Sequence, residues 1–165
     1  MFGLGSLAQT RPSTAPAPSP CLDEAAHPEY RQLDFWVGEW EVFNGDKKLA
    51  DVSVTKILNN CALSESWKGS HGDGVGISLY NARIKKWEYF WAADHGATSF
   101  FVGELLSNEM RYRMEQPQPD GTVRLRHWSL TKLPDGKVRE LSVGSTDDGA
   151  TWNTEYDYTW VLKKA

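Results

Sequence analysis

Turn signals recur at intervals of about 8–14 residues from Leu33 to the end of the chain, and they limit the fold more than any other feature of the sequence. Examples are Asn44-Gly45-Asp46, Pro134-Asp135-Gly136 and Asp147-Asp148-Gly149. The runs between them are short and aromatic, and the chain contains eight Trp. Helical spacing is confined to a short turn over His27–Asp34, and these patterns therefore predict an all-β protein with one short N-terminal helical turn.

The short connections between successive runs favour an antiparallel meander. A meander of this length must protect its two edge strands, and closure does so. We therefore predict an antiparallel up-and-down β-barrel of about ten strands from Leu33 to Lys163, with a sandwich as the alternative. The expected strands are Glu39–Asn44, Lys48–Leu58, Cys61–Lys68, Val75–Tyr80, Lys86–Ala93, Ala97–Glu104, Glu109–Gln116, Thr122–Leu133, Lys137–Ser145 and Ala150–Lys163.

Composition narrows the class of protein further. A chain of 165 residues fits one domain. The net charge of -4 disfavours nucleic acid as a partner, and no apolar run is long enough to predict a membrane span. Two Cys exclude a disulfide-dense scaffold and a four-thiolate zinc site. The oligomeric state is not readable from the sequence.

Residues 1–28 differ in composition from residues 29–165, which we assign to the barrel domain. Thr10–Pro20 is rich in Pro, Ser, Thr and Ala, which predicts a flexible tail. Before it, Ser6-Leu7-Ala8 is a small-x-small triplet of the kind that signal peptidase cuts. The first residues are then either a signal-peptide remnant of a periplasmic or secreted protein or a tail without such a role.

The two Cys support export. Cys21 lies just before the expected barrel and Cys61 begins a strand. In an oxidising compartment we expect them to form a disulfide, whereas in the cytosol they would be two free thiols.

Alternation along the strands predicts which side chains face the barrel lumen. Met110, Tyr112 and Met114 oppose charged neighbours, and Glu65 lies between two apolar residues of the same parity. Val123 and Leu125 predict that His127 points inward and that Arg124 and Arg126 point outward, unless a bulge reverses the strand. Tyr and Trp combine flat apolar surface with a polar group, which suits a small organic ligand. The expected ligand-binding residues are Glu65, Trp67, Tyr89, Trp91, Tyr112, His127, Tyr156 and Tyr158.

The run Leu33-Asp34-Phe35-Trp36-Val37-Gly38-Glu39-Trp40 resembles the N-terminal Gly-x-Trp motif of the lipocalin and fatty-acid-binding superfamily, the calycins. With Cys61–Trp67, Gly76–Asn81 and Ser145–Trp152, it is similar to lipocalin-like exported bacterial proteins of unknown function related to the DUF1579 group. The resemblance spans roughly Glu29 to Lys163. It implies a calycin-type barrel in which Gly38 and Trp40 are structural, and it brings no established ligand or reaction.

Ser145-x-Asp147-x-Gly149-x-Thr151-Trp152 matches the Asp-box pattern, in which Ser and Asp side chains bond turn amides and Trp packs against the hairpin. We interpret Ser145, Asp147, Gly149 and Trp152 as structural. His71, Asp73, Asp94 and His95 lack metal-ligand spacing and are expected to be solvated. We predict no metal and no cofactor.

Three functions remain open. The first is non-catalytic binding of a small hydrophobic or amphipathic molecule in the lumen. The second is a barrel enzyme, such as an isomerase, cyclase or hydrolase, with Glu65 or His127 as acid/base; no nucleophile–base pair is readable. The third is a structural or protein-interaction module. A cavity separates the first two from the third, and a close Glu65–His127 or Glu65–Tyr pair facing it favours the second.

Overall fold

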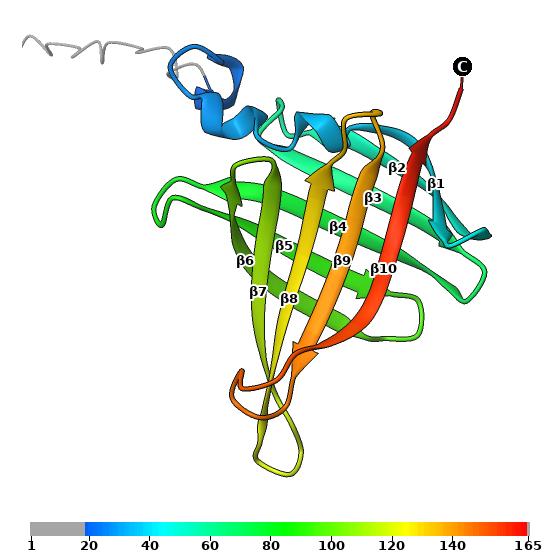
Figure 1. Cartoon of the computed structure of the whole chain (residues 1–165). Helices are drawn as coiled ribbons and strands as arrows, with labels where there is room; N and C mark the ends of the chain where they lie inside the picture. The colour runs from blue at the N-terminus through cyan, green and yellow to red at the C-terminus, as the bar shows by residue number, and fades with distance from the viewer. Residues whose placement is uncertain (1–18, 165) are drawn as a thin grey trace, which may run out of the picture.

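The computed structural model describes residues 19–164, and its ten strands form one closed antiparallel barrel in which neighbours in sequence are neighbours in space, with β1 pairing to β10. Figure 1 shows this meander running from β1 to β10 around the barrel. The up-and-down barrel predicted from the turns is confirmed, and the sandwich is wrong. The strands are β1 (Gly38–Asn44), β2 (Lys47–Ile57), β3 (Ala62–Gly69), β4 (Gly72–Asn81), β5 (Lys86–Ala93), β6 (Thr98–Leu106), β7 (Glu109–Pro117), β8 (Val123–Lys132), β9 (Val138–Ser145) and β10 (Asn153–Leu162).

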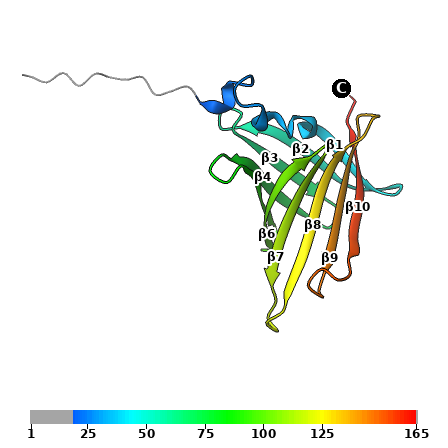
Figure 2. The ribbon, with the colours of Figure 1, turned by 60° about the vertical axis from the view of Figure 1, so that its left-hand side comes forward.

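A short helical segment crosses one end of the barrel (Figures 1 and 2). It consists of the 3₁₀ helices η1 (Pro20–Leu22), η2 (Pro28–Arg31) and η3 (Asp34–Trp36). Pro28 begins η2, where its fixed φ and missing N–H are tolerated. We call this the capped end, and the opposite end, reached by the hairpins β3–β4, β5–β6, β7–β8 and β9–β10, the mouth.

A disulfide between Cys21 and Cys61 fastens the helical segment to the β2–β3 turn, with a Cα–Cα distance of 4.9 Å. The predicted pairing is confirmed. Arg31 adds two hydrogen bonds there, from Nη2 to the carbonyl oxygens of Cys21 and Asn60. The capped end is therefore held covalently as well as by packing.

The loop expected over Gly69–Gly74 is a tight hairpin instead. Gly69 pairs with Gly72, so only Ser70 and His71 connect the strands, and β4 begins at Gly72. Gly72 has a φ of +129°, which L side chains rarely adopt. The Ser6-Leu7-Ala8 triplet lies outside the described residues. Among the residues described, no helix has the length and apolar character needed to cross a membrane.

Candidate ligand-binding cavity

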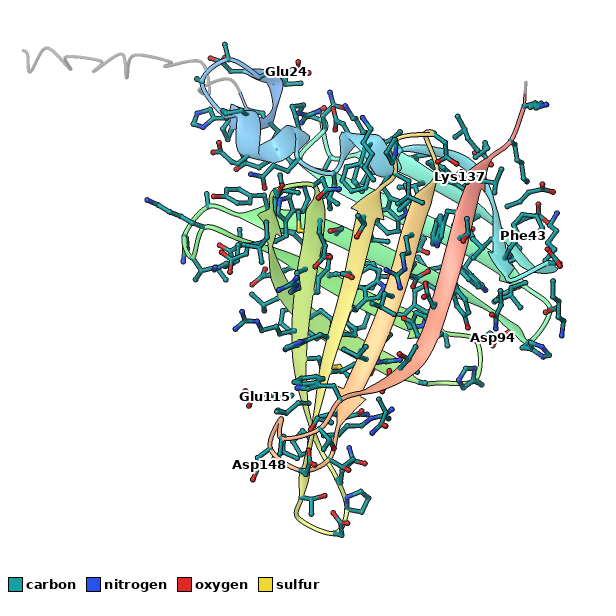
Figure 3. All side chains as sticks on the ribbon, viewed as in Figure 1. Glu24, Phe43, Asp94, Glu115, Lys137 and Asp148 are labelled. Atoms are coloured by element: carbon teal, nitrogen blue, oxygen red, sulfur yellow. A yellow bond between two sulfur atoms is a disulfide. The ribbon has the colours of Figure 1, made fainter. Side chains whose placement is uncertain are left out.

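The lumen is packed at the capped end and hollow towards the mouth. At the capped end Trp36, Trp40 and Trp160 are buried, and the Trp160 ring lies 5.5 Å from that of Trp36 and 6.2 Å from that of Trp40, between centroids. Towards the mouth lies a cavity of about 320 Å³, near the lower end of the range for small-molecule sites. Figure 3 gives the two ends: Lys137 lies at the capped end, and Asp94 and Asp148 lie at the mouth end. The aromatic residues lining the cavity are Trp67, Tyr89, Trp91, Phe101, Trp128, Tyr156 and Tyr158.

Glycines of β4 make room for these rings. A Cβ at Gly74 would lie 2.1 Å from the Trp91 ring, and one at Gly76 would lie 2.6 Å from the Tyr89 hydroxyl and 2.7 Å from Glu65 Oε2. Both positions face the lumen, because Gly76 pairs with Glu65 on one side and with Trp91 on the other. The Gly72-x-Gly74-x-Gly76 spacing thus clears one face of a strand, and large polar and aromatic side chains occupy the cleared space.

Glu65 is buried in the cavity wall, where 3% of its surface is exposed. The Tyr89 hydroxyl donates a hydrogen bond of 2.6 Å to Oε2. Burial raises the pKa of Glu65 to about 8; the Tyr89 hydrogen bond opposes this rise, and the nearby charge of Glu140 adds to it. At neutral pH Glu65 is therefore mostly protonated and can donate a hydrogen bond into the cavity.

Glu140 is the second buried carboxyl group of the cavity, and its surroundings differ. The indole N–H groups of Trp128 and Trp160 donate to its two oxygens, each at 2.8 Å. Burial raises the pKa of Glu140, while hydrogen bonds from Trp160, Trp128 and Tyr156 and the charge of Arg126 lower it. Each oxygen of Glu140 thus accepts a hydrogen bond from the protein itself.

Arg126 contributes a cationic group to the wall. Its Nε donates to Glu155 and, at 3.0 Å, to Ser142 Oγ, and its guanidinium lies 5.6 Å from the ring centroid of Tyr156 and 5.9 Å from that of Phe101. Glu155 also pairs with Arg124. Burial opposes ionisation of Glu155, but Ser142 and the two arginines outweigh it, and the pKa of Glu155 is lowered. The charge of Arg126 is thereby engaged within the protein.

Six of the eight residues expected to bind ligand line the cavity. A seventh, Tyr112, points inward but lies below the cavity floor, fully buried, with its hydroxyl 2.9 Å from Ser78 Oγ and its ring stacked on Trp128. Its neighbours fill the space that a ligand would need. The six are Glu65, Trp67, Tyr89, Trp91, Tyr156 and Tyr158.

The eighth, His127, was predicted wrongly. His127 pairs with Arg113 and Val143 and stacks on Trp152 at 4.1 Å, on the outer side of the wall, whereas Arg126 and Trp128 line the cavity. Burial, with the charges of Arg113 and Arg111, lowers the pKa of His127, so the ring is neutral near pH 7. An acid–base pair of Glu65 with His127 is therefore not formed.

The error has a physical cause. In the part of β8 and β9 nearest the mouth, the lumen side carries polar Arg126 and Ser142. The outer side carries apolar Leu125 and Val143 there, which reverses the pattern of an ordinary core. The apolar outer residues are half-buried because the β9–β10 hairpin lies over them: Leu125 is next to Gly149, and Trp152 covers His127. A register shift between Thr154 and Tyr156 turns Glu155 towards Arg126. The cavity residues that sequence reasoning missed include Phe101, Arg126, Trp128 and Glu140.

The β9–β10 hairpin is closed by side-chain bonds. Ser145 Oγ accepts from the Gly149 amide at 2.9 Å, Asp147 accepts from the amide and hydroxyl of Thr151, and Trp152 Nε1 donates to the Gly149 carbonyl at 3.1 Å. The Thr151 bonds, with a further one to Ser145, lower the pKa of Asp147 to about 2. These contacts hold the hairpin over the outer wall.

At the start of β1, Gly38 has a φ of +152°, and a Cβ there would lie 2.7 Å from Leu162. This conformation lets Trp40 turn into the capped end, where its indole nitrogen donates to the Trp36 carbonyl oxygen at 2.9 Å. The Gly-x-Trp pair thus sits beneath the helical segment.

The mouth carries exposed charged groups. Asp94 accepts a hydrogen bond from the Asp73 amide, and Asp73 pairs with Lys68 at 2.7 Å. Within residues 19–164 no group of three or more His, Cys, Asp or Glu is placed to hold a metal ion. His71 and His95 line the rim of the cavity.

No protein-family model and no curated protein sequence matches this chain.

Proposed function

We propose that the barrel binds a small hydrophobic or amphipathic molecule in its cavity without transforming it. The observation that carries this proposal is the cavity of about 320 Å³, walled by seven aromatic side chains and reached from the mouth, with Glu65 presenting a polar group inside. A barrel that needed only stability would fill this space, because each void forfeits packing contacts. A binding cavity supports the ligand-binding and enzyme hypotheses over a purely structural role.

The test is a fluorescence titration with the neutral apolar probe N-phenyl-1-naphthylamine. A matched pair of variants separates the cavity from the outer wall: Ala93 lines the cavity, whereas its neighbour Ala92 points to the opposite face. Ala93→Phe should weaken probe binding about tenfold or more by filling the mouth, and Ala92→Phe should leave it unchanged.

The control matters because the outer wall is itself apolar. Ile77, Phe90 and Phe100 are cross-strand neighbours and at least 39% exposed. Equal binding by both variants would assign the probe to this outer surface and would refute the proposal.

One observation favours a second candidate, an enzyme. Glu65 and Tyr89 form a close pair facing the cavity, and a carboxyl with a raised pKa is suited to general acid catalysis. Glu65 is then the acid, and the reaction class stays open. Incubating the molecule extracted from natively purified protein with fresh protein, and following its conversion by mass spectrometry, separates the two. Conversion by wild type and not by Glu65→Gln would favour the enzyme.

We also propose that the chain is a lipocalin-like protein related to the DUF1579 group, which the closed ten-stranded barrel supports. In this proposal residues 1–28 precede a barrel domain of residues 29–165. We further propose that the protein is periplasmic or secreted, which the disulfide supports. Fractionation of the native host, with antibody detection, tests the location.

A further inference from the structure

Glu65 is the one cavity carboxyl group that the described residues leave with an unused oxygen. Its Oε2 accepts a hydrogen bond from the Tyr89 hydroxyl, whereas Oε1 accepts no hydrogen bond from the described residues. Glu140, by contrast, has an indole donor on each oxygen. Because a buried carboxylate requires a partner, Glu65 either keeps its proton or meets a donor that enters the cavity.

Arg126, the one Lys or Arg side chain of residues 19–164 in the cavity lining, is bonded elsewhere. Arg126 is held by Glu155 and Ser142 and lies over the rings of Phe101 and Tyr156. Its charge lowers the pKa of Glu140, and no hydrogen bond or ion pair joins it to Glu65 among the described residues. On the β3 side of the cavity, Glu65 therefore has no cationic partner among the described residues. On the β9 side, Glu140 has two indole donors and the nearby charge of Arg126.

Aromatic faces surround the space in front of Glu65. Trp67, two residues along β3, and Trp91 of β5 stand edge to face at 6.4 Å, and both line the cavity. Tyr89 and Trp128 continue the wall, with ring centroids 4.5 Å apart. Indole and phenol faces attract organic cations, most strongly where water is excluded.

From the unused carboxyl oxygen inside an aromatic wall we infer that the cavity takes a small organic monocation, an amine with an apolar or aromatic body, whose ammonium group hydrogen-bonds Glu65. This inference rests on the proposed function and names its ligand class. An acid as ligand would have to displace Glu155 from Arg126 and lie in the same small cavity as Glu140. The amine meets an oxygen that no described residue bonds, and it displaces only the proton of Glu65.

Binding should release a proton, because a cation favours the ionised form of Glu65. The groups facing Glu65 are Tyr89 and Tyr112 from β5 and β7, Glu140 from β9, and Tyr156 from β10, with Arg126 beyond them on β8. The pKa values of these three tyrosines are raised, so they stay neutral below pH 9. With the pKa of Glu65 at about 8, amine affinity should rise ~50-fold from pH 6 to pH 8.

Three probes with the same ring and different charge test the inference by isothermal titration calorimetry: tryptamine, the neutral indole-3-ethanol and the anionic indole-3-acetate. The wild-type protein should bind tryptamine about tenfold or more tightly than the alcohol, as a charged hydrogen bond is worth that much. Glu65→Gln should remove the preference. The matched control is Glu115→Gln, which replaces a carboxyl group in the same way on the exposed outer side of β7, labelled in Figure 3, and this variant should keep the preference for tryptamine.

Titrations of wild type in two buffers of different ionisation enthalpy should show release of close to one proton at pH 7, a readout that survives even if Glu65→Gln fails to fold. Four outcomes would each overturn the inference. The wild type could bind the alcohol or the acid more tightly than tryptamine, or Glu65→Gln could keep the preference for tryptamine. Binding could also occur without proton release, or the protein could bind N-phenyl-1-naphthylamine and none of the indoles. In those cases the proposed binding function still stands if Ala93→Phe blocks the probe that does bind. Failure of all four probes would refute both.

Discussion

The two halves of the lumen are built from similar aromatic residues but do different things. At the capped end Trp36, Trp40 and Trp160 pack against one another and against aliphatic side chains such as Leu130 and Val138, all nearly inaccessible to water. Towards the mouth, Trp67 and Trp91 are only partly buried and border the cavity. The rings interlock and fill the lumen at the capped end, whereas towards the mouth they wall a cavity. There, glycines of the neighbouring strand β4 leave room for the side chains of Tyr89 and Trp91.

The largest expected effect comes from the packed half. Trp36→Ala should lower the free energy of unfolding by about 3–5 kcal/mol, because it removes a fully buried ring and leaves a void. Trp67→Ala should lower it by about half as much or less, since its ring already borders a cavity. Guanidinium unfolding followed by circular dichroism measures both. Equal losses would contradict the division of the lumen into two halves.

The disulfide lies at the capped end, away from the cavity. Cys21→Ser with Cys61→Ser opens a link between residues 40 apart, which should reduce stability by about 2–4 kcal/mol. Binding of N-phenyl-1-naphthylamine at the mouth should change less than twofold in protein that remains folded. A loss of probe affinity larger than the loss of folded protein would show that the two ends are coupled.

In the mouth half, the protonation of Glu65 should make the stability of the protein depend on pH. The pKa of Glu65 is raised to about 8, so between about pH 4.5 and 8 the folded state holds a proton that the unfolded state has lost. The free energy of unfolding should therefore fall as pH rises through this window, by up to about 1.4 kcal/mol per unit.

Urea unfolding of wild type and Glu65→Gln at pH 5, 6, 7 and 8 measures this slope. The variant should flatten it, although Glu140, whose pKa is also raised, retains part of it. The stability contributed by Asp147 does not interfere, since its pKa is lowered to about 2 and its effect is lost only as pH falls below about 4. An identical slope in the two proteins would show that Glu65 is ionised in the folded state.

The smallest effect is expected for His127→Ala. The ring stacks on Trp152 outside the wall, so its loss should reduce stability by about 1 kcal/mol or less. Probe affinity at the cavity should not change. A tenfold loss of affinity would place His127 on the lumen side after all.

The sequence by itself determined the strands, the closure and the disulfide. Turn residues such as Asn44-Gly45-Asp46 act locally, through φ values and short-range hydrogen bonds, and so the ten strands fall within a few residues of their expected bounds. Two Cys allow one pairing only. The glycines Gly72, Gly74 and Gly76 of β4 recur every two residues, which by itself indicates that one face of this strand carries no side chains. Only the structure shows that Tyr89 and Trp91 occupy the room left there.

Tertiary structure decided the composition of the site. Parity along a strand assigns a face only when one side is dry and the other is wet, and this rule held for β7, where Tyr112 points inward and Arg113 outward. On β8 and β9 the lumen side is a polar cavity and the outer side lies under a hairpin, so the pattern assigned His127 to the lumen instead of Arg126. Which side is dry depends on a hairpin that begins some 20 residues later in the chain, and no local pattern contains that information.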